Sequence, residues 1–111
     1  MKNSSKITLA GLAMLFASVM IQAAPVSENW ENLCTKCHGA DGKGETKIGK
    51  KLKLRDYTDA AVQAKMTDEE ITKAITNGIT DGGKEKMKAF GADLTKDEVK
   101  ALVSHIRKFK S

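Results

Sequence analysis

The segment Cys34-Thr35-Lys36-Cys37-His38 constrains this chain more than any other stretch of its sequence. It contains both cysteines of the 111 residues. Two thiols separated by two residues can add to the two vinyl groups of one haem, and a histidine directly after the second thiol can bind the iron from one face. We therefore interpret the segment as the covalent attachment site of one haem c. Cys34 and Cys37 are the expected thioether donors, and His38 is the expected axial ligand.

Other uses of a C-x-x-C pair fit the chain less well. A thioredoxin-like redox pair lies near a βαβ pattern, and no such pattern is visible. A structural zinc site needs four ligands, whereas the chain has one other histidine, His105, and no second cysteine pair. An ordinary disulfide of a secreted protein is a further alternative, although it leaves His38 without a role.

Residues 1–23 have the layout of a secretory signal peptide. Two lysines precede an apolar run over residues 7–21, and two alanines follow at positions 23 and 24. Such a segment is removed from the mature protein, so we expect cleavage after Ala23 and one domain over residues 24–111. An uncleaved anchor is the alternative, because the uncharged stretch nearly reaches the length that spans a bilayer.

The export signal and the haem motif support each other. Covalent haem attachment takes place outside the cytoplasm, so a haem motif without an export signal would be unexpected. Together they predict the periplasm of a bacterium. A mature chain this short buries a limited fraction of its surface, and a buried haem ligated by the protein would add the stabilisation that small domains need.

The mature part is predicted to be all-α, with about four short helices and no strand. Ser27 is the expected cap of a helix that runs into the cysteine pair, and Thr58 the expected cap of a helical turn over 59–64. Capping boxes at 67–70 and 95–98 open two further helices. The first of these ends at Gly78, and the second runs to the end of the chain.

The terminal helix carries one apolar stripe. Its members recur with the spacing of a single helix face: Val99, Leu102, Val103, Ile106 and Phe109. This face needs a partner, and the first helix offers Trp30 and Leu33 one turn apart. We expect the two chain ends to pack together around the haem.

A second axial ligand is expected from a methionine. A thioether raises the reduction potential of haem iron, which suits an electron carrier. After removal of the signal peptide only Met66 and Met87 remain. Met66 directly precedes a capping box and is interpreted as an apolar packing residue. Met87 lies in a loop between two helices and is the predicted ligand. His105 is the rival, but it falls near the solvent edge of the terminal helix.

With these residues in place, the chain resembles a small single-haem class I cytochrome c of the bacterial periplasmic kind. The likeness covers essentially the whole mature chain. Its motifs are Cys34-x-x-Cys37-His38-Gly39, Asn77-Gly78 and Met87-Lys88-Ala89-Phe90. The resemblance implies a compact cytochrome c fold, with a few helices around one covalent haem and the first and last helices crossed. It also implies one-electron transfer and places the axial methionine at Met87.

Two departures from that family matter. Many members have proline directly after the ligand methionine, where this chain has Lys88. Many also have proline in the loop after the haem motif, where its carbonyl orients the ligand histidine. This chain has no proline over 48–52, so we expect a backbone carbonyl at Gly49 or Lys50 to orient His38. Loss of both prolines predicts a looser Met87 loop and a weaker Fe–S bond.

Positive charge gathers in two loops. Between Lys43 and Arg55 there are six basic residues and one acidic residue, and Lys84, Lys86 and Lys88 surround the predicted ligand. A basic ring at the haem edge would attract redox partner proteins with an acidic docking face. The alternative is that these charges only keep the loops solvated. We expect no nucleic-acid partner, a monomer, and membrane contact only through a membrane-bound redox complex.

The expected function is that of a soluble periplasmic electron carrier rather than an enzyme. One alternative is a small haem sensor or peroxidase-like enzyme with a labile distal ligand. No histidine or arginine lies near Met87 in the sequence, which weighs against efficient peroxide chemistry. A further alternative is a structural subunit of an oxidase.

Overall fold

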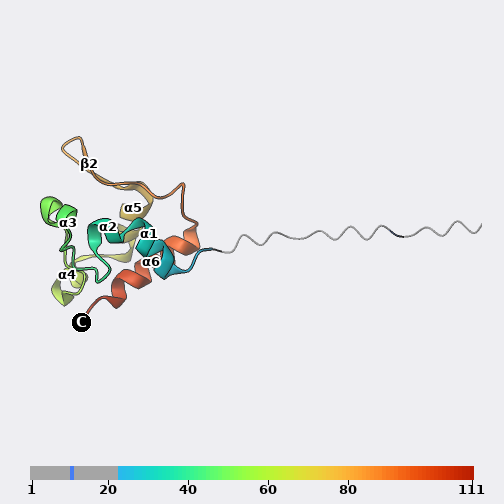
Figure 1. The fold of residues 1–111 in the computed structure, drawn as a ribbon, viewed down its shortest axis with the longest axis horizontal. Helices are drawn as coiled ribbons and strands as arrows, with labels where there is room; N and C mark the ends of the chain where they lie inside the picture. Colours follow the sequence, from blue (N-terminus) through green and yellow to red (C-terminus); the bar gives the residue numbers. More distant parts are fainter. Residues whose placement is uncertain (1–10, 12–22) are drawn as a thin grey trace, which may run out of the picture.

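The computed structural model describes residue 11 and residues 23–111 (Figure 1). The predicted signal peptide over residues 1–23 lies almost entirely outside the described residues, and its cleavage site stays a prediction. Among the residues that are described, no helix is long and apolar enough to span a membrane.

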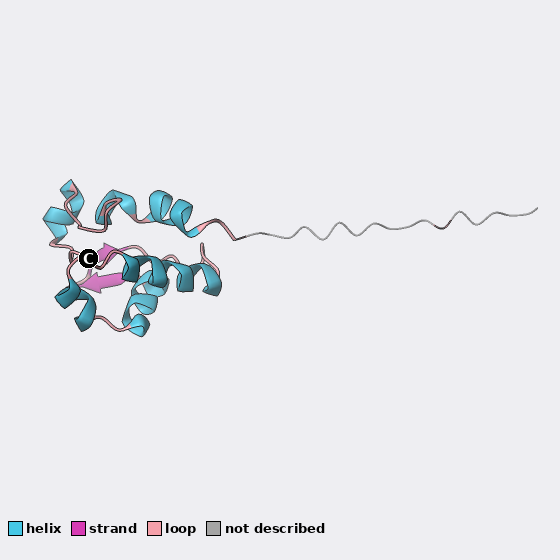
Figure 2. Cartoon of the chain, turned by 90° about the horizontal axis from the view of Figure 1, so that it is seen from below, coloured by secondary structure: helices cyan, strands magenta, loops and turns pink. Residues whose placement is uncertain are grey.

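The described chain contains six helices and one β-hairpin. In chain order they are α1 (Val26–Leu33), α2 (Thr35–His38), α3 (Lys47–Leu52), α4 (Ala60–Lys65), α5 (Asp68–Asn77), β1 (Ile79–Asp81), β2 (Lys84–Met87) and α6 (Lys96–Lys108). The expected helical character is confirmed, but the all-α prediction with about four helices is incomplete. Figure 2 shows the two strands as antiparallel arrows within an otherwise helical chain.

The hairpin arises from local turn chemistry. Gly82 and Gly83 join the strands and have φ angles of 55° and 77°. Two successive residues with positive φ make the tight turn that matches the twist of a two-stranded ribbon. The strands escaped sequence analysis because their residues are exposed or half-buried and show no apolar alternation. Met87 therefore lies at the end of a strand, rather than in a loop between helices.

The helix caps agree with the sequence in part. Thr95 and Glu98 form a full capping box at the start of α6, as predicted. At α5 the Thr67 side chain accepts a hydrogen bond from the Glu70 backbone N–H, which is one half of the predicted box. Ser27 is not the cap of α1, because the helix already begins after Pro25. At α4 the cap is Asp59 instead of Thr58, since the Thr58 hydroxyl donates to Asp56.

The first and last helices pack together, as expected (Figure 1). The apolar stripe of α6 faces the core, where Leu102 is only 1% exposed and Trp30 of α1 is 4% exposed. At the edge of this contact, the amide of Asn29 donates to the Glu98 carboxylate at 2.7 Å. Residues far apart in the chain are thereby held against each other.

A second tie joins α4 to α6 around Gln63, which is 4% exposed. Its Nε2 donates to the backbone carbonyls of Tyr57 and Ile106, each at 2.8 Å. Arg107 donates through Nη1 to the Gln63 side-chain oxygen at 2.9 Å and through Nη2 to the Met66 carbonyl. These bonds fix the end of α6 on the segment that precedes α5, and so shape one wall of the interior.

Candidate cofactor site

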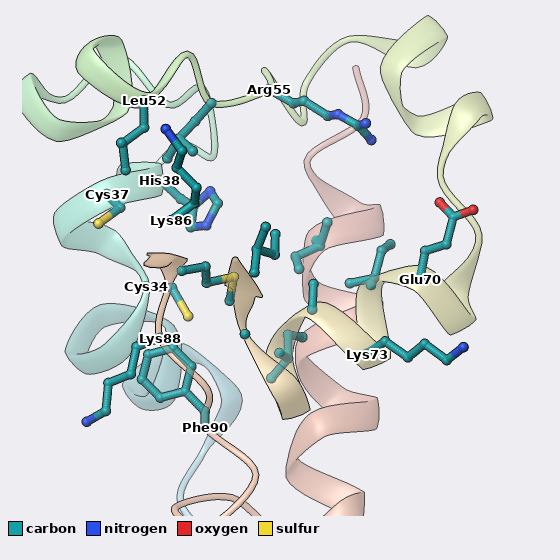
Figure 3. Close-up of a pocket in the computed structure, with 18 of the residues that line it drawn as sticks. Cys34, Cys37, His38, Leu52, Arg55, Glu70, Lys73, Lys86, Lys88 and Phe90 are labelled. Atoms are coloured by element: carbon teal, nitrogen blue, oxygen red, sulfur yellow. The ribbon is translucent and has the colours of Figure 1, made fainter. Parts of the chain in front are cut away.

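One large cavity, of about 960 Å³, lies inside the domain (Figure 3). Its apolar wall comes from α1, the link between α4 and α5, α5, α6 and the segment after the hairpin. Its members are Trp30, Met66, Ile71, Ile75, Phe90, Leu102 and Ile106. Cys34, Cys37, His38 and Met87 all line the same cavity. The structure thus brings together all four residues that the sequence singled out. Whether each of them binds haem stays a prediction.

The cysteine–histidine segment is shaped by its own backbone hydrogen bonds. The His38 N–H donates to the Cys34 carbonyl at 2.9 Å, which closes the short helix α2. Gly39 ends that helix with φ 82°, a conformation that glycine adopts readily. The Trp30 indole N–H donates to the Gly39 carbonyl at 3.1 Å, and the Thr46 hydroxyl donates to the Cys37 carbonyl at 2.6 Å. Two neighbouring elements therefore hold α2 in place.

The two thiols are free and differ in environment. Cys34 is buried and Cys37 is half-buried. Burial, with a smaller contribution from Cys37 nearby, raises the pKa of the Cys34 thiol to about 11. Both sulfur atoms lie on the same side of the opening as the His38 ring (Figure 3). The arrangement presents two thiols and an imidazole to one occupant.

The His38 ring is held by aromatic packing. Tyr57 stacks on it with ring centroids 5.3 Å apart and an interplanar angle of 22°, and the Trp30 ring lies 5.8 Å away. Burial lowers the pKa of His38, which favours the neutral imidazole that ligates metals. The packing role of Tyr57 was not predicted from the sequence. A single aromatic residue gives no signal of its partner.

The expected carbonyl partner of His38 is not found. The Gly49 carbonyl accepts from the Leu54 N–H at 2.9 Å, and the Lys50 carbonyl accepts from the Lys53 N–H at 3.3 Å. Nδ1 of His38 is buried and has no hydrogen-bond partner among the described residues. An unsatisfied buried nitrogen costs free energy. Because Nδ1 is buried, the nitrogen that His38 can offer to an occupant of the cavity is Nε2.

The two methionines occupy different positions on the cavity wall. Met66 is 7% exposed and belongs to the main apolar core, as does Ile71 of α5. Its predicted packing role agrees with that position. Met87 is half-buried at the end of β2 and packs against the edge of the core. Only Met87 comes from an element that the core does not already enclose.

His105 is less exposed than expected. Its ring lies 5.2 Å from that of Trp30 and 5.0 Å from that of Phe109, and the side chain is half-buried. Burial, and then the charge of Lys108, lower its pKa. His105 does not line the cavity, so it packs against the outer side of Trp30 instead of facing the interior.

Charged residues surround the mouth of the cavity. Five of its lining residues are basic and two are acidic: Lys53, Arg55, Lys73, Lys86, Lys88, Glu70 and Asp81. In Figure 3, Arg55, Glu70 and Lys73 lie on the far side from the two cysteines, while Lys88 lies beside Phe90. The Lys88 ammonium is 5.8 Å from the centre of that ring. The entrance therefore carries a positive excess around an apolar interior.

These features fit a haem. Cofactor cavities are mostly apolar, with few polar groups, and have volumes of roughly 300–1,000 Å³. This one is large and apolar and presents two thiols, one imidazole and one thioether. Cys34 and Cys37 would hold the haem covalently, while His38 and Met87 would be its axial ligands.

Comparison with known proteins identifies c-type cytochromes as relatives of this chain. The family described as "Cytochrome C oxidase, cbb3-type, subunit III" matches residues 22–106. A solved structure described as the KustC0563 c-type cytochrome is 39% identical and has a TM-score of 0.70, with 79% of this chain and 100% of that chain covered. A mutant of that protein is also 39% identical, with a TM-score of 0.65 and coverage of 78% and 100%. No curated protein matches the chain.

Proposed function

Because the chain belongs to the c-type cytochromes, we propose that it is a soluble periplasmic electron carrier. It is a small class I member and matches the family described as subunit III of cbb3-type cytochrome c oxidase. The proposal includes one haem c attached through Cys34 and Cys37, with His38 and Met87 as axial ligands. Haem iron supplies the reversible gain and loss of one electron.

One observation carries the proposal. Two separate pieces of chain reach the same apolar cavity: the segment with Cys34, Cys37 and His38 at the end of α1 and in α2, and Met87 at the end of β2. Met87 is separated from His38 by nearly 50 residues of sequence. Such convergence of two thiols, one imidazole and one thioether supports a six-coordinate haem with no open position for a substrate.

Each of these residues has a distinct task. The thioethers would tie the cofactor to α1 and α2, so that it stays bound in both oxidation states. His38, held by Tyr57, would present its imidazole in one orientation. Met87 would favour the reduced iron, because a thioether is a soft ligand. The buried side chains of α5 and α6 would exclude water from the haem. The surroundings of the iron would then change little when its charge changes on electron transfer.

The basic residues at the cavity entrance favour a partner with an acidic surface. Lys53, Arg55 and Lys88 are exposed around the cavity entrance. Charges of one sign attract the opposite surface of a partner and speed its association, and added salt screens this attraction. We include in the proposal a redox partner with an acidic docking face, soluble or part of a membrane complex.

Visible spectroscopy of the holoprotein tests the ligand assignment. Met87→Leu is expected to abolish the far-red Fe–S absorption band of the oxidised protein and to let the reduced protein bind CO. Met66→Leu is the matched variant, since Met66 is the second methionine on the cavity wall. The Fe–S band should persist in Met66→Leu. A band that survives Met87→Leu, or a wild-type protein that binds CO readily, would favour the sensor or enzyme alternative.

Electron-transfer kinetics test the partner surface. The rate of electron transfer with an acidic redox partner should fall as the ionic strength rises, and Lys88→Glu should slow the transfer further. Lys100→Glu makes the same charge change on α6 at an exposed position that does not line the cavity. Equal slowing by both variants would show that only net charge matters, and would contradict a docking role for the mouth.

A further inference from the structure

The backbone of Met87 is in unusually close contact with the residue that ends α5. Gly78 has φ 71° and ψ −175°. A Cβ atom built on Gly78 would lie 2.5 Å from the Met87 carbonyl oxygen and 2.8 Å from the Ala89 backbone nitrogen. Cβ atoms essentially never come so close to other heavy atoms. Both neighbours are main-chain atoms, so no side chain could rotate away to make room.

The same stretch is bonded to the last turn of α5. The Phe90 N–H donates to the Ile75 carbonyl at 2.9 Å, and the Gly91 N–H donates to the Thr76 carbonyl at 3.0 Å. Carbonyls at a helix C-terminus have no partner within the helix, so these bonds satisfy both sides. Ile75 and Phe90 are themselves buried in the core. The chain is therefore seated on α5 immediately after Met87.

The hairpin constrains the other side of Met87. Ile79, the residue after Gly78, pairs with Met87 across the two strands. A two-stranded ribbon alone is marginally stable in water, and residues 79–85 are exposed. The hairpin by itself would therefore hold Met87 loosely. Contact with the rigid end of α5 supplies the missing constraint.

We propose that Gly78 is the positioning residue for Met87, because the absence of its side chain lets the Met87 backbone rest directly on the end of α5. This inference rests on the proposed ligand role of Met87. It also offers a physical substitute for the proline that many family members have directly after the ligand methionine, where this chain has Lys88. The Fe–S bond should accordingly be firm, contrary to the looser loop expected from the sequence.

Alanine substitutions in the holoprotein test this role with a close control. Gly78→Ala places a methyl group against the Met87 backbone. Gly83→Ala imposes a comparable backbone strain, since Gly83 has φ 77°, but nothing lies within 4 Å of its added Cβ. We expect Gly78→Ala to lose most of the far-red Fe–S band and to bind CO when reduced. Gly83→Ala should keep the band and exclude CO.

A second variant keeps the test informative if Gly78→Ala misfolds. A Cβ at Gly91 would lie 2.8 Å from the Thr76 carbonyl oxygen, so Gly91→Ala pushes the same segment from α5 without a positive φ. It should also weaken the Fe–S band. Far-UV circular dichroism and covalent haem content establish that each variant is folded and loaded, which separates ligand displacement from loss of the domain.

The outcomes distinguish this inference from the proposed function. If Met87→Leu retains the band, Met87 is not the ligand and the ligand assignment fails. If Met87→Leu loses the band while folded Gly78→Ala and Gly91→Ala both retain it, only the positioning role fails. Equal losses in Gly78→Ala and Gly83→Ala would also overturn it, because strain in the hairpin would then explain the effect without the contact.

Discussion

Replacing Gln63 with leucine should lower the free energy of unfolding by about 2–3 kcal/mol. Leucine has a similar volume but cannot form hydrogen bonds. Gln63 is 4% exposed, so the groups that it leaves behind cannot turn to bulk water without local opening. The change therefore tests whether a buried amide, and not apolar contact alone, fixes the end of α6 on the rest of the domain.

The magnitude follows from the bonds that are lost. The Nε2 group makes two neutral bonds of 2.8 Å to backbone carbonyls, and each is worth about 1 kcal/mol. The bond from Arg107 is 2.9 Å long and charge-assisted. The Arg107 side chain is 30% exposed and keeps its bond to the Gln63 backbone carbonyl, so this loss is about 1 kcal/mol after screening. The apolar gain from leucine offsets part of the total.

Guanidinium unfolding of the holoprotein, followed by circular dichroism, measures the effect. The transition midpoint should fall while its slope stays constant, since the same surface is exposed on unfolding. Gln63 does not line the cavity, so the visible spectrum should remain that of the wild type. Arg107→Leu and the double variant complete a cycle that isolates the coupling between the two side chains.

Two results would refute this reasoning. A loss below about 0.5 kcal/mol would place Gln63 in the range of ordinary surface substitutions, and would mean that its bonds are replaced at no cost. A zero coupling in the double-mutant cycle would mean that Arg107 does not depend on the Gln63 side chain. In either case the tie between α4 and α6 would have to come from apolar packing.

Three further predictions concern the core, pH and the haem-attachment segment. Leu102→Ala, at the most buried side chain of α6, should cost about 2–5 kcal/mol in guanidinium unfolding. Hydrogen bonds from Asn29, and then from the Thr95 backbone, lower the pKa of Glu98 below its ordinary 4.5. A lowered folded-state pKa stabilises the protein above the ordinary value, and this contribution is lost as the pH falls through the folded-state pKa. Thermal unfolding should therefore show wild type losing its advantage over Glu98→Gln below about pH 4.5, and a constant difference would contradict this. Gly49→Ala would drive a Cβ against the Gly44 carbonyl and to within 2.7 Å of the Cys37 carbonyl, so the yield of covalent haem protein should drop, whereas an unchanged yield would show that α2 tolerates displacement.

Local patterns were sufficient where neighbouring residues alone determine the structure. The capping box at Thr95 and the apolar stripe of α6 depend on spacings within a single helix, and both agree with the structure. The short helix α2 (Thr35–His38) is also held by bonds within a few residues, although the sequence predicted only one helix running into the cysteine pair. Gly82-Gly83 also carried a local signal, because adjacent glycines favour a tight hairpin turn. That signal was interpreted only as a loop, since the charged flanking residues gave no strand pattern.

Contacts between distant segments could not be predicted from such patterns. The stack of Tyr57 on His38 and the bonds of Gln63 to α6 join residues that have no periodic relation in the sequence. The use of the Gly49 carbonyl by Leu54, rather than by His38, depends on how α3 ends. Each is a choice among several partners of the same chemical type, and only packing decides it.

The sequence by itself determined the chemistry of this protein: two thiols, an imidazole and two remaining methionines in a small helical domain. The reason is that covalent spacing along the chain sets which groups can act together at one attachment segment. Tertiary structure alone decided how the predicted ligand, Met87, is held. Met66 is enclosed by the core, whereas Met87 reaches the cavity at the end of a hairpin that rests on Gly78. Close packing of backbone against backbone produces that difference, and no local pattern records it.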